Sequence, residues 1–568
     1  MRTRRSLIRL VAAALPLVLS ACHRPTPPRG RFTLSVVGTN DLHGHLESLP
    51  VFGGFVANLR RVRAQDGGAV VLVDAGDMFQ GTLESNLNEG AAVVRAYAAL
   101  GYLAVAIGNH EFDYGPVGPA VSVPAGQACA AGAEPPPDQD PRGALRARAA
   151  EAPFPFLDAN LVDTATGRPP AWTNVVPGVV REVKGVKLGI LGVTTSGTPR
   201  LTLAANFSGL AVTPLAPAIV ATAADLRRQG ATVVIALAHA GGDCHRFDDP
   251  ADLSTCDKHD EIFDVARALP AGTVDLIVAG HTHKGVAHRV NGIPVVEAFS
   301  NGRAFDRVDL TVDRATGRVV DAAIFAPHDL PWRDSVQLAA YEGEVVSVDR
   351  STAAAVAQAE AAAAALREQR LGVDLAEPLP RAQKTESALG NLVTDLMRAA
   401  RPGADVALLN GGGLRADLPI GPLTYGRLYE ALPFDNRFAT IPTTAGELAA
   451  VIAANLSHGN GIVSVSGVRA TARCMAGSLA VTLARSDGRP IPPDARLTVL
   501  TSDFLATGGD DLLPDTWQRR ATLDGGPPIR DAIADQLRAR GHVPPPRELV
   551  PPAAPRLEYS GKRPVHCR

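Results

Sequence analysis

The chain has 568 residues, of which 46% are hydrophobic and 20% charged, and its 56 basic and 58 acidic residues give a formal net charge of −2. This length exceeds one typical domain and predicts two domains joined by connecting segments, each able to bury a core. The balanced charge argues against a nucleic-acid coat or a membrane-surface binder, so no nucleic-acid polymer is expected as a partner.

The N-terminus predicts an export signal. A basic stretch (residues 2–9) precedes a short apolar run (residues 10–19) and then Ser20, Ala21 and Cys22. The run is shorter than the roughly 20 apolar residues of a membrane span. The string LSAC resembles a bacterial lipobox, which implies a lipoprotein signal over residues 1–22 and an acylated Cys22. We therefore expect an exported protein anchored to a bacterial membrane by this lipid alone, facing the periplasm or the cell exterior. A plain secretory signal is the alternative.

Residues 23–31 are rich in Pro and Arg and predict a tether. From Phe32 onward, short β-branched runs each end in polar residues: FTLSVVGTNDLHG, AVVLVDAGD, LAVAIGNHEFD, VKLGILGVTT, TVVIALAHAGGD and VDLIVAGHTHKG. Continuous apolar strands of this kind, alternating with helical stretches such as residues 91–100, indicate sheets buried on both faces.

Two segments interrupt this rhythm. Residues 115–148, with PPP at 135–137, predict an inserted loop. The run STAAAVAQAEAAAAALREQR consists of strong helix formers without a breaker, and it predicts a long solvated linker helix within residues 335–372. A low-complexity alanine tract is the alternative. The first domain then spans 32–334 and a second α/β domain spans 373–557, with strands near VALLN, FATIP and RLTVLTSD.

Export also bears on the other cysteines, because disulfides persist in oxidising compartments. Cys244 and Cys256 lie close together in a polar, Asp-rich loop and are the favoured pair. Cys474 and Cys567 could tie the tail to the second domain, which leaves Cys129 odd. The alternative is that all of them are unpaired.

The polar residues that end the first-domain strands carry the functional argument. In open α/β sheets, catalytic groups collect at the carboxyl ends of strands, because several strands there face one crevice. Those ends supply Asp41 with His43, then Asp77, then Asn109 with His110 and Asp113, then His239, and finally His281 with His283. A lone histidine after a strand is more often a turn or surface residue, but a repeated set of imidazoles and carboxylates suits divalent ions such as zinc, manganese or cobalt. Two ions roughly 3.5–4 Å apart can orient a phosphate and lower the pKa of a water.

These motifs, NDLHGH at 40–45, DAGDMFQGT at 74–82, GNHEFDYG at 108–115, ALAHAGGD at 236–243 and AGHTHKG at 279–285, resemble the calcineurin-like metallophosphoesterases and, within them, the secreted bacterial 5′-nucleotidases and UDP-sugar hydrolases. The resemblance implies an α/β (α+β) protein with an N-terminal four-layer αββα sandwich and a C-terminal α/β substrate-binding domain. It implies that one of two divalent metal ions is held by Asp41, His43 and His283. The other would be held by Asn109, His239 and His281, with Asp77 bridging.

The same resemblance implies that His110 and Asp113 are a pair near the leaving group. A carboxylate held on an imidazole favours the protonated ring, which can stabilise phosphoryl oxygens or donate a proton to a departing alkoxide. A turn-capping role also suits Asp113. Asp74 competes with Asp77 for the bridging place, and Asp77 is favoured because it follows Gly76, where the chain can approach the metals closely. His45 and His259 are interpreted as residues behind the ligands or on the surface.

Two strings of the second region, NGGGLRADLPIGPLTYGRLYEALPFDNRF at 410–438 and TSDFLATGGDD at 501–511, resemble the substrate domain of the nucleotidases. Asn410 begins the glycine run, Gly412 lets the backbone pass close to a ligand, and Arg415 can bind phosphate bidentately. By resemblance, Phe434 and Phe504 sandwich the base and Asp510 holds the ribose hydroxyls. Stacking tolerates different bases. Plain core packing is the alternative for each phenylalanine.

Two positions depart from the pattern. Gln383 and Thr385 stand where similar proteins carry arginines, which favours monophosphates over diphosphates, although Arg381 or Lys384 could substitute. We expect a monomeric two-metal phosphohydrolase that releases phosphate from 5′-nucleotides, with a metal-activated water as nucleophile. The alternatives are a 2′,3′-cyclic-nucleotide phosphodiesterase with 3′-nucleotidase activity, a UDP-sugar hydrolase, or a thiosulfate-handling hydrolase, which the stacking phenylalanines disfavour. A catalytically silent nucleotide-binding lipoprotein would have lost ligands, and none is missing.

Overall fold

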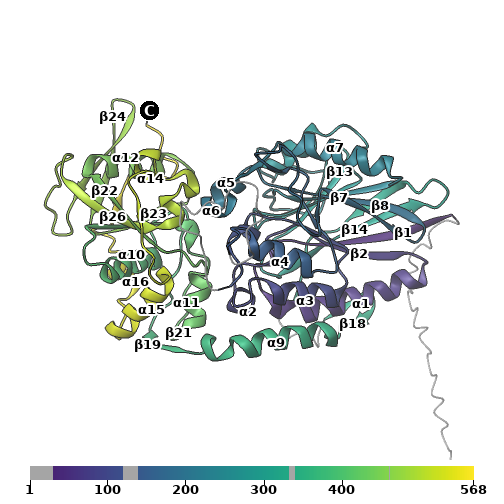
Figure 1. Ribbon diagram of the computed structural model, residues 1–568, viewed down its shortest axis with the longest axis horizontal. Coiled ribbons are helices and arrows are strands. Elements are labelled where there is room, and N and C mark those ends of the chain that lie inside the picture. The colour runs from purple at the N-terminus through teal and green to yellow at the C-terminus, as the bar shows by residue number, and fades with distance from the viewer. Residues whose placement is uncertain (1–29, 119–138, 332–338, 460, 568) are drawn as a thin grey trace, which may run out of the picture.

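The computed structural model describes residues 30–118, 139–331, 339–459 and 461–567, which form two lobes (Figure 1). The expected signal peptide, most of the tether, the lipidation site Cys22 and Cys129 lie outside these residues. None of the helices in the described part of the chain has the length and hydropathy needed to cross a bilayer.

The N-terminal lobe is built on two mixed sheets. The first has the order β15-β14-β1-β2-β3-β4-β6, with β16 paired to β14. Its strands are β1 (Arg31–Thr39), β2 (Ala69–Asp74), β3 (Ala104–Ala106), β4 (Phe156–Leu157), β6 (Val175–Val176), β14 (Ala304–Asp313), β15 (Val319–Ile324) and β16 (His328–Asp329). The second has the order β12-β13-β11-β10-β8-β7. Its strands are β7 (Gly178–Val183), β8 (Val186–Thr194), β10 (Val233–His239), β11 (Leu276–Ala279), β12 (Gly285–Val290) and β13 (Ile293–Ala298). A small separate pair is formed by β5 (Leu161–Asp163) and β9 (Leu210–Val212).

Both faces of each sheet are covered. Leu34 and Val36 of β1 pack in an apolar cluster with Leu237 of β10, between the two sheets, whereas Val37 packs against the outer helices. The first sheet is covered by α1 (Leu49–Gln65), α3 (Ala91–Leu100) and α4 (Gly143–Glu151), and the second by α7 (Leu215–Arg228) and α8 (Glu261–Ala268). This burial explains the continuous apolar strands and confirms the four-layer αββα sandwich. Short turns of helix complete the lobe: η1 (Leu46–Ser48), α2 (Leu83–Asn86), η2 (His110–Phe112), α5 (Thr198–Leu201) and α6 (Ala204–Phe207).

The structure differs from two sequence-based expectations in this lobe. The segment expected to be an inserted loop over 115–148 contains the first turns of α4, which begins at Gly143. The lobe also extends past residue 334, because β17 (Ala340–Tyr341) and β18 (Glu344–Val345) form a hairpin whose Tyr341 packs on Phe55, with ring centroids 5.2 Å apart. Residues 339–349 are therefore not helical, since apolar side chains of the hairpin find partners in the first lobe.

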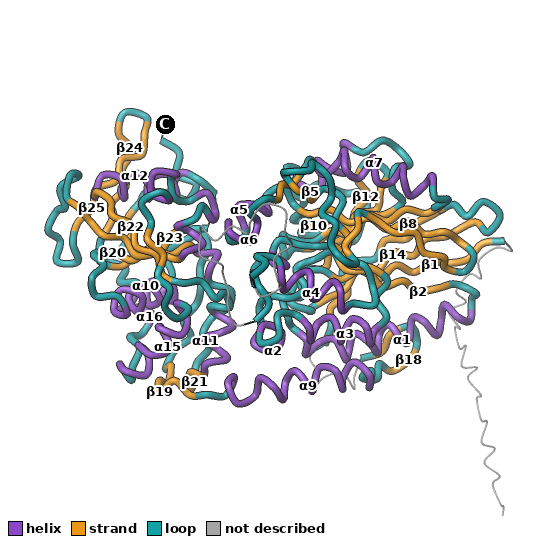
Figure 2. Tube along the Cα trace, viewed as in Figure 1, coloured by secondary structure: helices purple, strands orange, loops and turns teal. Residues whose placement is uncertain are grey.

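Helix α9 (Arg350–Arg367) begins after Asp349, whose side chain accepts a hydrogen bond from the Thr352 backbone N–H. It runs along α1 and α3 rather than through solvent (Figure 2). Val356 and Ala359 belong to the N-terminal core, and Ala363 belongs to the C-terminal core. The expected linker helix is thus a packed element shared by both cores.

The C-terminal lobe is built around a mixed sheet of order β23-β20-β26-β22-β27. Its strands are β20 (Val406–Asn410), β22 (Phe438–Thr444), β23 (Val463–Ser466), β26 (Arg496–Ser502) and β27 (Thr522–Leu523). Two smaller sheets contain β19 (Arg370–Leu375) with β21 (Gly421–Thr424), and β24 (Arg469–Met475) with β25 (Ser478–Ala484) and β28 (Leu557–Glu558). The helices are α10 (Ala388–Ala400), η4 (Gly411–Gly413), α11 (Tyr425–Ala431), α12 (Ala445–Ser457), α13 (Asp503–Ala506), η5 (Gly509–Asp511), α14 (Asp515–Gln518), α15 (Ile529–Arg540) and α16 (Pro546–Leu549).

The tail continues beyond residue 557, where the second domain was expected to end. Strand β28 pairs with β24, and Val565 belongs to the core of the lobe. A disulfide joins Cys244 to Cys256, which confirms the favoured pair, and another joins Cys474 to Cys567, the second pairing that the sequence allowed.

Candidate active site

The ligand residues expected from sequence come together because their strands run parallel. In register, Thr39 of β1 is opposite Asp74 of β2, and Ala238 of β10 is opposite Ala279 of β11, so the loops that follow leave the same edge of the sandwich. The loops after β1 and β2 are also joined directly, by hydrogen bonds from the N–H of Asp41 to the carbonyl of Gly76 (2.9 Å) and from the N–H of His43 to the carbonyl of Asp77 (3.0 Å).

The first cluster of donor atoms consists of Asp41, His43 and His283. Nε2 of His43 lies 3.0 Å from Nε2 of His283, which in turn lies 3.2 Å from Oδ1 of Asp41. That carboxylate oxygen is buried without a hydrogen bond of normal geometry among the described residues. A buried carboxylate oxygen facing two imidazole nitrogens fits a bound divalent cation, which would satisfy all three atoms at once.

The second cluster consists of Asp77, His239 and His281, with Asn109 beside it. Nε2 of His239 lies 3.0 Å from Oδ2 of Asp77 and 3.1 Å from Oδ1 of Asn109. The same Oδ2 of Asp77 lies 4.0 Å from Nε2 of His43 in the first cluster. Asp77 therefore faces both groups of donors, which is the geometry expected of a carboxylate between two sites.

Backbone carbonyls fix the orientation of two of these imidazoles. Nδ1 of His43 donates to the carbonyl of Gln80 (2.8 Å), and Nδ1 of His239 donates to the carbonyl of Ala75 (2.9 Å). A carbonyl only accepts, so each Nδ1 carries the proton and each Nε2 directs its lone pair at the cluster. This is the arrangement of metal-binding histidines.

The backbone is strained where these side chains are presented. Five of the expected ligands have a positive φ, which is uncommon outside glycine: Asp41 (48°), His43 (50°), Asp77 (57°), His281 (86°) and His283 (59°). Each such residue costs about 1–3 kcal/mol and persists only where its surroundings impose it. Gly76, at φ 97°, could not carry a Cβ, which would lie 2.7 Å from the backbone nitrogen of Gly108.

The charge state of the site also suits metal binding. Burial alone would raise the pKa of Asp77, but His239, His110 and His43 outweigh it and hold that pKa well below its usual value. Burial, with the charge of His239, lowers the pKa of His281 to about 4. Burial opposes protonation of His239, yet Asp77 and Asp41 raise its pKa to about 10, so without a metal a proton on Nε2 balances part of the anionic charge of the cluster, and a bound cation would replace that proton.

The competing carboxylate, Asp74, is already occupied. Its Oδ2 accepts hydrogen bonds from the hydroxyls of Thr39 (2.6 Å) and Tyr97 (2.8 Å), and its Oδ1 accepts from the N–H of Gly76 (2.8 Å). Burial raises its pKa to about 7. Asp74 therefore supports the end of β2, as the sequence suggested.

His110 and Asp113 form a pair beside the clusters. Nδ1 of His110 lies 2.5 Å from Oδ2 of Asp113, and the N–H of His110 donates to Oδ1 of Asp77 (2.8 Å). Burial lowers the pKa of His110, but Asp113 and Asp77 outweigh it and raise that pKa above its usual value. The ring thus favours the protonated form that a proton donor or phosphate-binding cation needs.

The N-terminal clusters and the C-terminal residues line one cavity of about 790 Å³. Asn410, Gly412, Arg415, Phe434, Phe504 and Asp510 all contribute to its wall, whereas Asp41 and His239 are fully buried behind it. Nδ2 of Asn410 donates to Asp510 (2.6 Å), and the ring of Phe434 lies 5.7 Å from that of His110.

Arg381 and Gln383 also line the cavity. His45 lies at its edge, and His259 lines a different hollow.

Sequence reasoning gave no role to Glu111, which is 1% exposed. Its carboxylate accepts four backbone hydrogen bonds, from Asp77 (2.8 Å), Met78 (2.7 Å), Phe79 (3.3 Å) and Gly108 (2.7 Å). Burial, together with Asp77, raises its pKa, whereas the backbone N–H donors favour the ionised carboxylate. The acidic residue inside GNHEFDYG was the available signal, but its partners lie on another loop.

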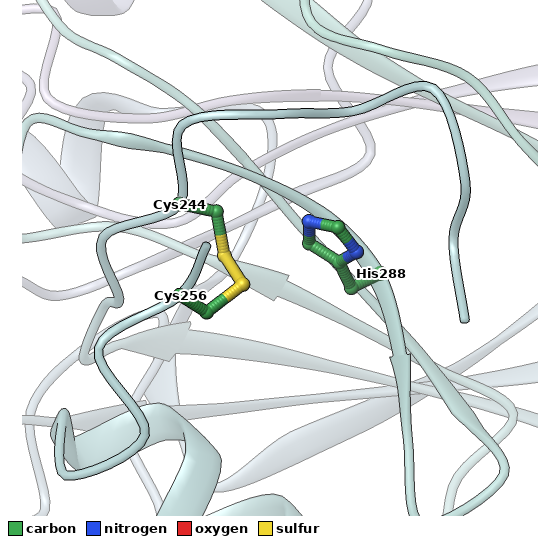
Figure 3. Close-up of side chains that lie close together, drawn as sticks. All are labelled: Cys244, Cys256 and His288. Carbon is green, nitrogen blue, oxygen red and sulfur yellow. A yellow bond between two sulfur atoms is a disulfide. The ribbon is translucent and has the colours of Figure 1, made fainter. Parts of the chain in front are cut away.

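A third group with ligand-type side chains consists of Cys244, Cys256 and His288 (Figure 3). The two sulfurs are joined in a disulfide, so neither is a thiolate that could bind a metal. Nε2 of His288 donates to the carbonyl of Arg246 at 3.0 Å. The disulfide and His288 therefore stabilise the loop that follows β10.

Comparisons with known proteins find relatives of this chain and a solved structure with a similar fold. Residues 368–515 match the family model described as "5′-nucleotidase, C-terminal domain". The chain is 28% identical over 506 residues to Endonuclease YhcR of Bacillus subtilis, and this match covers 85% of this chain but only 38% of that protein. It is 25% identical over 523 residues to Protein UshA of Yersinia enterocolitica, covering 85% and 88% of the two chains. The structure of a 5′-nucleotidase precursor from Thermus thermophilus superposes with a TM-score of 0.70 at 25% identity, covering 93% of this chain and 99% of that one.

Proposed function

We propose that this chain, which is similar to 5′-nucleotidases in its C-terminal sequence and in its fold, is a metal-dependent hydrolase that releases phosphate from nucleotides. The observation that carries the proposal is the single cavity lined both by the His- and Asp-rich clusters and by Arg415, Phe434 and Phe504. A nucleotide whose phosphate is held at the clusters can therefore place its base against Phe434 and Phe504, the base-binding wall, in the same cavity.

Asp41, His43 and His283 would hold one divalent ion, Asn109, His239 and His281 would hold a second, and Asp77 would serve both. Bound ions of this kind polarise phosphoryl oxygens and lower the pKa of an attacking water. Zinc, manganese and cobalt all suit this mixture of imidazole and carboxylate ligands.

The remaining residues bind and orient the substrate. Arg415 pairs with the phosphate through its planar guanidinium. His110, held by Asp113, donates a proton to the departing 5′-oxygen or stabilises the phosphoryl oxygens. Phe434 and Phe504 stack on the base, and Asp510, oriented by Asn410, accepts hydrogen bonds from the ribose hydroxyls.

Phosphate release from a substrate panel tests this function. The purified protein, loaded in turn with zinc, manganese and cobalt, is assayed on AMP, ADP, a UDP-sugar, a 2′,3′-cyclic nucleotide and an aryl phosphate. AMP is expected to be the best substrate. Preference for the UDP-sugar or the cyclic nucleotide would replace the assignment by one of those activities. Nucleotide binding without turnover under every metal would indicate a silent binding protein.

We also propose that the protein is a monomer exported and anchored through a lipid on Cys22, which lies outside the described residues. Since acyl chains supply most of the membrane affinity of such a protein, Cys22→Ser should move it from the membrane to the soluble fraction of cells. A variant that stays in the membrane fraction would rule out the lipid anchor.

A further inference from the structure

Helix α2 (Leu83–Asn86) is one of the elements of the N-terminal lobe that contact the C-terminal one. Its Leu83 is 2% exposed and belongs to the apolar cluster of the C-terminal lobe, with Leu428 and Leu432. Its Glu84 forms an ion pair with Arg367 at the end of α9 (2.7 Å). The last residue of this helix, Asn86, lines the catalytic cavity.

The side-chain amide of Asn86 joins three segments of the active site. Its Nδ2 donates to the carbonyl of Pro433 in the C-terminal lobe (3.2 Å). Its Oδ1 accepts from the N–H of Gly81 (3.0 Å) and from the hydroxyl of Tyr114 (2.8 Å), both in the N-terminal lobe. One amide thus uses its donor across the domain boundary and its acceptor within the catalytic domain.

Each partner is next to a residue that binds the base or that orients a side chain of the active site. Pro433 precedes Phe434 of the base-binding wall. Gly81 follows Gln80, whose carbonyl accepts from Nδ1 of His43. Tyr114 follows Asp113, which holds His110. A displacement of the C-terminal lobe therefore reaches the segments that orient His43 and His110 through the Asn86 amide.

Another polar contact between the lobes, the Arg200–Asp511 ion pair, does not line the catalytic cavity. Arg200 and Asp511 form an ion pair at 3.3 Å, but their side chains are 57% and 61% exposed. Exposed pairs of this kind contribute little to a fixed geometry because water screens them. Asn86 is partly buried and lies at the cavity wall.

We propose that Asn86 is a positioning residue that couples the placement of the base to the alignment of the catalytic loops, and so favours nucleotides over phosphate esters that do not reach the base-binding wall. This inference rests on the proposed nucleotidase function. A nucleotide bound against Phe434 fixes the Pro433 carbonyl, which fixes Asn86 and, through its acceptor, the Gly81 and Tyr114 segments. A small aryl phosphate does not engage this relay.

Two substitutions distinguish the donor of the Asn86 amide from its acceptor. Asn86→Asp keeps an oxygen for Gly81 and Tyr114 but removes the donor to Pro433. Asn86→Ala removes both. The added charge of the Asp variant acts on the phosphate of every substrate, so the readout is the ratio of kcat/KM for AMP to that for an aryl phosphate.

Asn86→Asp should lower this ratio about tenfold, mainly through kcat for AMP, since loss of one hydrogen bond in an aligned site has roughly this effect. Asn86→Ala should lower turnover of both substrates. The matched control is Asn88→Ala, because the side chain of Asn88 bonds to Glu84 and Ala92 within the N-terminal lobe. This control should leave the ratio within about twofold of the parent.

A double-mutant cycle tests whether Asn86 acts through the base-binding wall. In a background of Phe434→Ala with Phe504→Ala, Asn86→Asp should no longer change the ratio, since the base has lost its wall. An unchanged ratio for Asn86→Asp in the parent, or the same loss in both backgrounds, would overturn the inference while leaving nucleotide hydrolysis established. A parent enzyme that cleaves aryl phosphates but not AMP would instead overturn the proposed function and the inference with it.

Discussion

Nη2 of Arg415 in the C-terminal lobe lies 3.5 Å from Nε2 of His43 in the N-terminal lobe. This contact places a guanidinium beside the first donor cluster, so Arg415 reaches a phosphate held there. Arg415→Ala should lower kcat/KM about 10- to 100-fold, the effect of losing a charge-assisted hydrogen bond. The loss should be similar for AMP and for an aryl phosphate, because both carry the phosphate. Steady-state kinetics on the two substrates measure it, and a loss confined to AMP would contradict the assignment.

The two phenylalanines of the base-binding wall should behave differently. Phe434→Ala combined with Phe504→Ala should lower kcat/KM for AMP roughly a hundredfold, from about 1–3 kcal/mol per lost stack. Part of this loss should appear in kcat, because binding energy from the base helps align the phosphate. Hydrolysis of an aryl phosphate should hardly change. Equal losses on both substrates would show that these rings support the fold instead.

Asp77 should be essential for turnover but not for folding. Asp77→Asn keeps the shape of the side chain and removes the negative charge that faces His239 and His43. Activity should be abolished and the metal content of the dialysed protein should fall. Elemental analysis and circular dichroism measure metal and fold independently of activity. Near-normal rate and metal content would show that Asp77 does not lie between two ions.

Glu111 should act on the metal site through the loop that carries Asp77. Glu111→Gln places an amide N–H₂ against backbone donors, so one or more buried N–H groups lose their acceptor at about 1–3 kcal/mol each. Metal affinity should weaken roughly 10- to 100-fold by titration calorimetry. Asp158→Asn is the matched control, since this buried carboxylate accepts from the N–H groups of Asn160 and Leu161 rather than from the loops that carry the proposed ligands. Equal metal affinity in both variants would refute a positioning role for Glu111.

Much of the N-terminal domain could be predicted from the sequence because its signals are local. Runs such as residues 69–74 and 233–239 are apolar without alternation, which requires burial on both faces, and the ligand residues follow them directly. Parallel pairing then brings those residues to one edge whatever the details of the loops. The sequence also distinguishes Asp77 from Asp74 by a local feature, because a glycine directly precedes Asp77.

Tertiary structure alone decided what depends on contacts between distant segments. Glu111 bonds to a residue 34 positions away and Asn86 to one 347 positions away, and no local pattern encodes such a partner. Helix α9 was recognisable as a helix from its composition, but not as a packed one. Its buried face includes Val356, Ala359 and Ala363, residues that do not stand out in an alanine-rich run until α1, α3 and the C-terminal core are placed against them. Helix propensity acts within a few residues, whereas burial depends on which surface lies opposite, and the fold supplies that surface.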